Sequence, residues 1–262
     1  MTRFHEIGEF REAGSSPHFF ASVWALLLLQ LSNWRWSWPQ MLLTGFLAPV
    51  VTSAGLGLYA HSTRIPGAST YVVSGSITLA LMFETQGRVA SNFAFIKHRG
   101  TIEYLSTFPV RQSALIVASV GSFGLLALPA VLVTSLVSAS LLGVSLNVSW
   151  LLIPLVVVIM LPFVSLGALI GSLSRSLEEA SSVSLALTVL MTGVGPVVVH
   201  PDLLPKPVLA AGVVNPAVYA SDIVRSILFS SPGGFPWQAT LILGAAGAIA
   251  ITVTSRAIKW RR

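Results

Sequence analysis

Apolar residues follow one another along this chain in long blocks that short polar or charged segments separate. A helix that crosses a bilayer needs about 20 apolar residues, because the hydrocarbon core is about 30 Å thick. The block from Gln112 to Ser174 contains no Asp, Glu, Lys or Arg and suits two such helices, with a turn at 143–149 where small and polar residues cluster. Measured in the same way along the whole chain, the pattern predicts six membrane-spanning helices, at about 38–61, 68–95, 112–142, 150–174, 180–200 and 237–256.

The segment before the first predicted span, residues 17–34, is ambiguous in this pattern. Phe19, Val23 and Leu27 repeat at helical spacing, but the apolar run is short for a span and leads into Trp34 and further aromatic residues. Aromatic side chains are typical of the headgroup level of a membrane. We expect an interfacial helix that lies along the cytoplasmic leaflet. The alternative is a seventh span, which would reverse the side of the N-terminus.

Basic residues are distributed unequally between the two sides of the six predicted spans. If the N-terminus lies inside, the cytoplasmic segments hold twelve Lys or Arg residues and the outer segments hold three, Arg64, Lys206 and Arg225. Lys and Arg gather in the cytoplasmic loops of membrane proteins. We therefore expect both termini to be cytoplasmic (N-in/C-in).

Composition narrows the class of protein further. Hydrophobic residues make up 54% of the chain and charged residues 9%, whereas soluble domains carry about 25% charged residues. A chain this poor in charge cannot cover a water-facing surface, which argues against a soluble enzyme, a disordered protein and a nucleic-acid binder. The chain has no cysteine, its five histidines are scattered, and it contains no P-loop, so we expect no metal site, no bound cofactor and no ATP hydrolysis by this chain. The sequence predicts an all-α polytopic membrane protein with one transmembrane domain over residues 1–262.

A first polar motif follows the second predicted span. Gly100 can end that span in a left-handed turn, Thr101 can cap a short helix, and Pro109 marks its end before the third span begins. This predicts a short cytoplasmic helix over about 100–108. The residues that begin it are Gly100, Thr101, Ile102, Glu103, Tyr104 and Leu105. An alternative is a plain interfacial loop whose preceding basic residues, Lys97, His98 and Arg99, lie at anionic headgroups.

A second motif lies in the predicted outer segment, residues 201–234. Asn215 is a good N-cap and Pro216 suits the first helical position, so a helix is expected to begin there. Three further polar residues lie on it: Tyr219, Asp222 and Arg225. Asp222 and Arg225 are spaced i, i+3 and can pair with each other. We favour a structural role for this pair over substrate contact.

Glu84 and Arg88 are the ionisable residues that the pattern places inside a span. Their i, i+4 spacing puts them on one face of the second predicted helix, so they can form an ion pair. A charge inside a membrane is costly and suggests a functional site, while Arg88 is near enough to the cytoplasmic end to extend towards the headgroups. A gating or pathway role and a structural pairing both remain open.

These motifs resemble those of a known family. The Gly-Thr-x-Glu-Tyr-Leu-x-x-x-Pro-Val run is similar to the first cytoplasmic loop of type-2 ABC exporter permeases, the family of daunorubicin-resistance and polysaccharide-export permeases. The Asn-Pro-x-x-Tyr-x-x-Asp-x-x-Arg run is similar to the segment before that family's last span. With six N-in spans after an interfacial helix, the resemblance covers nearly the whole chain. It departs from the family at 97–99, where members often carry acidic residues.

The resemblance implies an ATP-driven exporter. Two separate ATPase subunits would bind ATP and Mg²⁺, and residues 101–107 would be the coupling helix that lies in a groove of the ATPase. A second permease copy or a paralogue would complete the complex in the plasma membrane, among its lipids. Residues 201–234 would form a re-entrant helical segment that closes the outer end of the pathway.

The resemblance also implies a substrate pathway lined by the first, second and fifth spans. Small and apolar residues there, among them Thr52 and Ser53, suit an amphipathic, drug-like or lipid-linked substrate. The alternative function is an ion-coupled secondary carrier of an apolar solute. Such carriers usually hold several carboxylates at membrane depth or inverted repeats, whereas this chain has only Glu84 and shows no repeat.

Overall fold

The computed structural model describes residues 19–32, 47–63, 65–101, 104, 107, 112–147, 152–229 and 235–257. All regular structure within these ranges is helical, as the sequence predicts. The elements are α1 (Phe19–Ser32), α3 (Ala48–Thr63), α4 (Ala68–Met82), the π-helix η3 (Phe83–Gly87), α5 (Arg88–His98), α7 (Gln112–Leu142), α8 (Leu152–Leu173), α9 (Leu177–Gly193), the 3₁₀-helix η4 (Pro201–Leu203), α10 (Lys206–Gly212), α11 (Pro216–Leu228) and α12 (Trp237–Ala257).

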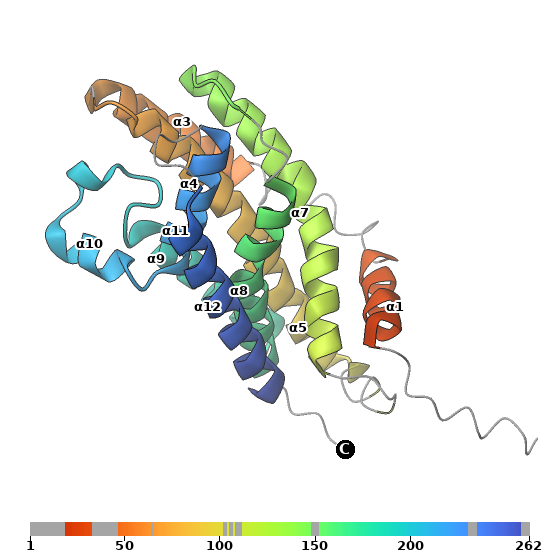
Figure 1. The fold of residues 1–262 in the computed structure, drawn as a ribbon. Helices are drawn as coiled ribbons and strands as arrows, with labels where there is room; N and C mark the ends of the chain where they lie inside the picture. Colours follow the sequence, from red (N-terminus) through yellow and green to blue (C-terminus); the bar gives the residue numbers. More distant parts are fainter. Residues whose placement is uncertain are drawn as a thin grey trace, which may run out of the picture.

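The long helices lie side by side in one bundle, with α8 in contact with α5, α7 and α12. The carboxyl ends of α5 and α12 lie at one end of the bundle, and the α3–α4 turn and the carboxyl end of α7 lie at the other (Figure 1). The α10 segment projects from the side of the bundle, next to α9 and α11 (Figure 1).

Three of the described helices are long and apolar enough to cross a membrane: residues 113–142 of α7, and the whole of α8 and α12. They match three of the predicted spans. A fourth span results if α10 and α11, which meet at 86°, are counted as one broken element. Gly143 at the carboxyl end of α7 adopts a φ of 62°, so the predicted turn begins there.

The other three predicted spans are divided differently in the structure. The first is described from α3 onwards, and residues 38–46 lie outside the described ranges. The second consists of α4, η3 and α5, which follow one another without a gap in the chain. The expectation of a helix over about 180–200 is wrong at its carboxyl end. The helix α9 ends at Gly193, because Val194 is extended, Gly195 has a φ of 102° and Pro196 follows.

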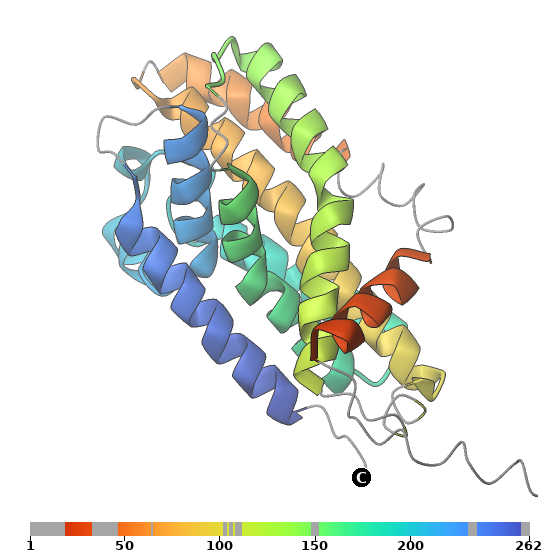
Figure 2. The ribbon, with the colours of Figure 1, turned by 45° about the vertical axis from the view of Figure 1, so that its right-hand side comes forward.

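The helix α1 lies across the amino-terminal half of α7 (Figure 2). Gln30 donates a hydrogen bond to the Ser119 hydroxyl at 3.0 Å and accepts one from Ser122 at 2.6 Å. Leu27 fits against Gly121, where an added Cβ would lie 2.7 Å from the leucine Cδ1. The Gln30 side chain of α1 is therefore used against α7. With 14 residues, α1 is shorter than the roughly 20 residues that a span needs.

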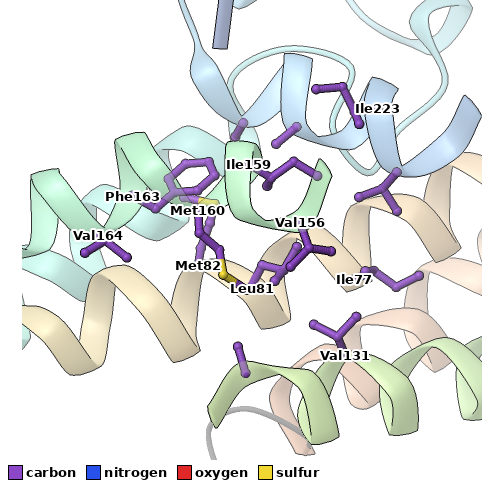
Figure 3. Close-up of a cluster of buried hydrophobic side chains, with 14 of the residues drawn as sticks. Ile77, Leu81, Met82, Val131, Val156, Ile159, Met160, Phe163, Val164 and Ile223 are labelled. Carbon is purple, nitrogen blue, oxygen red and sulfur yellow. The ribbon is translucent and has the colours of Figure 1, made fainter. Parts of the chain in front are cut away.

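The core lies where α4, α7, α8 and α11 meet. Figure 3 shows aliphatic and sulfur-containing side chains from these helices, with the Phe163 ring among them. Ile77, Met82, Ile159 and Phe163 are all at most 1% exposed. Burial of this cluster packs α4, α7, α8 and α11 together. It therefore fixes the position of α11, which carries the second motif, against α4.

Candidate functional site

The segments α4, η3 and α5 connect the two regions that carry the motifs. The first motif follows α5 directly, beginning at Gly100. The helix α11, which carries the second motif, packs against α4. One continuous stretch of helix, Ala68 to His98, therefore extends from the helix of the second motif to the start of the first motif.

The first motif begins as the sequence predicts. Gly100 has a φ of 69°, the left-handed turn that ends a helix. The Tyr104 N–H donates to the Gly100 carbonyl at 3.0 Å, and the Thr107 N–H donates to the Tyr104 carbonyl at 3.1 Å. Thr101 and Tyr104 are helical, and the Tyr104 side chain is 63% exposed. Three residues of the motif lie outside the described ranges: Ile102, Glu103 and Leu105.

Two of the three basic residues before Gly100, Lys97 and Arg99, contact other parts of the protein. The Lys97 ammonium donates to two main-chain carbonyls, of Ser172 at 2.8 Å and of Ser174 at 2.9 Å. The Arg99 guanidinium lies 4.3 Å from the centroid of the Phe95 ring. The alternative that Lys97 extends to lipid headgroups is therefore wrong, because its charge is satisfied at the carboxyl end of α8.

Glu84 and Arg88 form the predicted ion pair, with Arg88 Nε 2.6 Å from Glu84 Oε2. The Glu84 side chain is fully buried and that of Arg88 is 11% exposed. Glu84 lies in η3, a π-helical turn that periodicity did not indicate. In the same turn, Gln86 donates to the Ser184 carbonyl at 3.2 Å and to the Thr188 hydroxyl at 3.4 Å. Gln86 thus holds the π-helical turn η3 against α9, and the ion pair joins η3 to the first residue of α5.

The two candidate pathway residues of α3 differ in their surroundings. Ser53 is buried, and its hydroxyl contacts the Ser76 hydroxyl at 3.1 Å and the Ser138 hydroxyl at 2.5 Å. Thr52 is partly exposed and donates to the carbonyl of Ala48 at 2.8 Å. Ser76 is eight residues before Glu84, about 12 Å along a helix. The structure therefore does not bring Ser53 and Glu84 together in one polar cluster.

The second motif joins two helices through Asn215. The side-chain oxygen of Asn215 accepts from the Ala217 N–H at 3.0 Å, which is the predicted N-cap of α11. The side-chain amide donates to the carbonyls of Met191, at 2.6 Å, and Val194, so it also caps the carboxyl end of α9. Tyr219 donates to the Val213 carbonyl at 2.5 Å. Pro216 takes the first helical position.

Asp222 and Arg225 pair at 2.7 Å, as their spacing predicts. The pair is more than a simple exposed contact, because the Arg225 side chain is 12% exposed and its guanidinium lies 3.4 Å from the centroid of the Tyr71 ring of α4. Arg225 also donates to the Ser221 hydroxyl at 2.9 Å. Arg225 therefore ties α11 to α4.

Sequence reasoning missed several of these contact residues. Gly167 and Gly171 of α8 lie against the main chain of Gln86 and Ala90. They form a small-x-x-x-small pattern, a signal of close helix packing that can be read from sequence. A basic residue in the last turn of a helix, such as Lys97, can bind terminal carbonyls, but the pattern does not say of which helix. Tyr71 carries no sequence signal for its contact with Arg225. In the described part of the chain, no three His, Asp or Glu side chains gather in a metal-binding arrangement.

The described part of the chain is all-helical, and three of its helices are long and apolar enough to cross a membrane, which defines a membrane protein. The family model described as ABC-2 type transporter matches residues 19–229, and the chain belongs to this family. It is thus the membrane-spanning permease of an ABC transporter, a transport subunit that is not itself catalytic, in a family that generally works with ABC ATPase subunits. A comparison with curated proteins returns no match to the chain.

Proposed function

We propose that this permease exports an amphipathic, drug-like or lipid-linked substrate, driven by two separate ATPase subunits that bind ATP and Mg²⁺. A second permease copy or a paralogue completes the complex in the plasma membrane. The observation that carries the proposal is the helical turn at Gly100–Thr107, which follows α5 directly and presents Tyr104 to the surface. A short helix at the end of a long one can transmit force from a docked ATPase, because the two helices are joined by one turn.

The proposal includes six spans with both termini inside. The spans are α3 with the residues before it, the α4–η3–α5 stretch, α7, α8, α9 and α12. Two observations support this arrangement. The carboxyl ends of α5 and α12 lie at the same end of the bundle, and basic residues are concentrated in the segments assigned to the inside. The 86° bend between α10 and α11 supports a re-entrant outer segment.

The pathway in this proposal lies along α3, the α4–η3–α5 stretch and α9. We assign Thr52 of α3 to this pathway, because its polar side chain is only partly buried. Ser53 holds three helices together through its two hydroxyl contacts, and the Glu84–Arg88 pair closes the π-turn. We assign these three residues to the integrity of the pathway wall. The ion-coupled carrier is set aside because the chain belongs to the ABC-2 type transporter family.

The coupling role is tested by replacing Glu103 and Tyr104 together with alanine. Neither residue lies in a proposed span, so membrane insertion should be unchanged. A few central residues carry most of the energy of a protein interface, so the ATPase should no longer co-purify with the double variant, and substrate-stimulated ATP hydrolysis in lipid should fall with it.

The matched control is Tyr59→Ala, which removes a tyrosine that is 55% exposed in α3, at the opposite end of the bundle. This variant should retain the ATPase. If the Glu103→Ala, Tyr104→Ala double variant binds the ATPase and exports substrate as the wild type does, the coupling role assigned to residues 100–107 is wrong.

A further inference from the structure

Lys97 connects the helix before the first motif to the end of a different helix. It lies in the last turn of α5, three residues before Gly100. Its ammonium donates to the carbonyls of Ser172, in α8, and Ser174, just after α8. The last carbonyls of a helix have no partner within the helix and carry partial negative charge. Lys97 therefore supplies from α5 the cap that the carboxyl end of α8 lacks.

The contact between α5 and α8 is close along the length that leads to this cap. An added Cβ at Gly171 would overlap the Ala90 carbonyl oxygen and lie 2.7 Å from the Cβ of Phe93. An added Cβ at Gly167 would lie 2.5 Å from the carbonyl oxygen of Gln86 in η3. The two helices thus touch through main-chain atoms, as helices in membranes do at small residues. With Lys97 at the end of this contact, α5 and α8 form a closely packed pair.

The helix α8 is in turn fixed to its other neighbours. The turn at Ser174–Ser176 leads directly into α9, where Ser176 accepts from the Glu179 N–H at 3.1 Å. On the far side, the Thr254 hydroxyl of α12 donates to the Ser165 carbonyl at 3.0 Å. These contacts connect the end of α5, through α8, to the start of α9 and to α12.

We propose that Lys97 is a positioning residue for energy coupling. It fastens α5, which leads into residues 100–107 (the coupling segment), to the α8–α9 turn. Movement of the coupling segment then displaces α5 and α8 together. The inference rests on the proposed role of that segment. Lysine suits the task because its ammonium is a point charge with three donors on a flexible stem, and it can bridge carbonyls of two different residues. A side chain of similar length that has no donor removes both hydrogen bonds and leaves the two helix ends free to separate.

The first test compares Lys97→Met with Lys97→Arg in the full permease, reconstituted in lipid with its ATPase. Methionine keeps the unbranched apolar stem but donates no hydrogen bond. The ATPase should co-purify with Lys97→Met as with the wild type, while the substrate exported per ATP hydrolysed falls by about 2- to 30-fold, the range expected for residues along a coupling network. Arginine also donates to carbonyls and should restore most of the ratio. Arg256→Met, which removes an exposed positive charge in the last turn of α12, is the matched control and should export normally.

The second test does not involve the ATPase. Because the chain has no cysteine, spin labels can be attached to one pair of introduced cysteines. The cysteines replace Phe95 of α5 and Leu173 of α8, whose side chains are 42% and 63% exposed. The wild type should give one narrow distance distribution between the labels. The Lys97→Met permease should give a broader distribution that is shifted to longer distances.

The outcomes separate this inference from the proposed function. An unchanged export ratio or an unchanged distance distribution in Lys97→Met overturns the role of Lys97. Loss of ATPase binding in Lys97→Met also overturns it, because Lys97 would then belong to the docking surface itself. If the wild-type permease binds no ATPase, the proposed function fails, and the label distances alone then decide whether Lys97 fastens α5 to α8.

Discussion

Replacing Gly171 by alanine should force α5 away from α8. The added Cβ would overlap the carbonyl oxygen of Ala90 and lie 2.7 Å from the Cβ of Phe93 and 3.0 Å from the N of Ala94. All three are main-chain or Cβ atoms, which cannot rotate out of the way. Carbon atoms in ordinary contact are about 3.5–4.0 Å apart, so the helices must separate locally by about 1 Å.

The magnitude follows from this displacement. Forcing one extra carbon into a close-packed contact costs about 1–3 kcal/mol. A separation of about 1 Å that reached Lys97 would lengthen its 2.8 Å contact with the Ser172 carbonyl beyond hydrogen-bond range. We therefore expect the loss of stability in Gly171→Ala to lie in the upper half of that range. The amount of substrate exported per ATP hydrolysed should fall as it does in Lys97→Met.

The assay is reversible unfolding of the purified permease in mixed micelles with increasing SDS, followed by helical circular dichroism. The control is Gly55→Ala in α3, where an added Cβ meets nothing within 4 Å. It should leave stability unchanged or raise it by about 0.5–1 kcal/mol, because alanine loses less conformational freedom than glycine in a helix. A Gly171→Ala permease as stable as the wild type would refute the close main-chain contact between α5 and α8.

Three further predictions concern other parts of the chain. Glu84→Gln leaves Arg88, 11% exposed, without its carboxylate and should destabilise the permease by about 3–5 kcal/mol in the same assay. Adding Arg88→Gln should recover part of the lost stability. A Glu84→Gln permease as stable as the wild type would show that the pair is not structural. Asn215→Ala removes caps from two helices and should cost about 1–3 kcal/mol, with faster hydrogen exchange at the α9–α11 junction; wild-type exchange there would contradict the capping role. Cysteines at Ser145 and Lys259 should react with an impermeant thiol reagent from opposite sides of the membrane, and labelling from the same side would overturn the six-span arrangement.

Features that depend on residues close together in sequence were predictable. The helices α7, α8 and α12 follow from uninterrupted apolar length. The N-cap at Asn215 and the pairing of Glu84 with Arg88 follow from local spacing. Chain neighbours are constrained to meet by helix geometry alone, so composition and spacing suffice for them. The functional roles of these residues, including those of the coupling segment, stay predictions.

The sequence by itself determined an all-helical membrane protein with polar motifs between its apolar blocks, because apolar length and capping are local properties of the chain. Only the tertiary structure decided which segments those motifs contact. Lys97 bonds to carbonyls 75 and 77 residues away, and Arg225 of α11 finds Tyr71 of α4. The π-turn at Phe83–Gly87 likewise lies against distant helices, α7, α8 and α9. Such contacts depend on how the helices pack. Many distant residues could accept the same hydrogen bond or contact the same ring, and the packing determines which of them does.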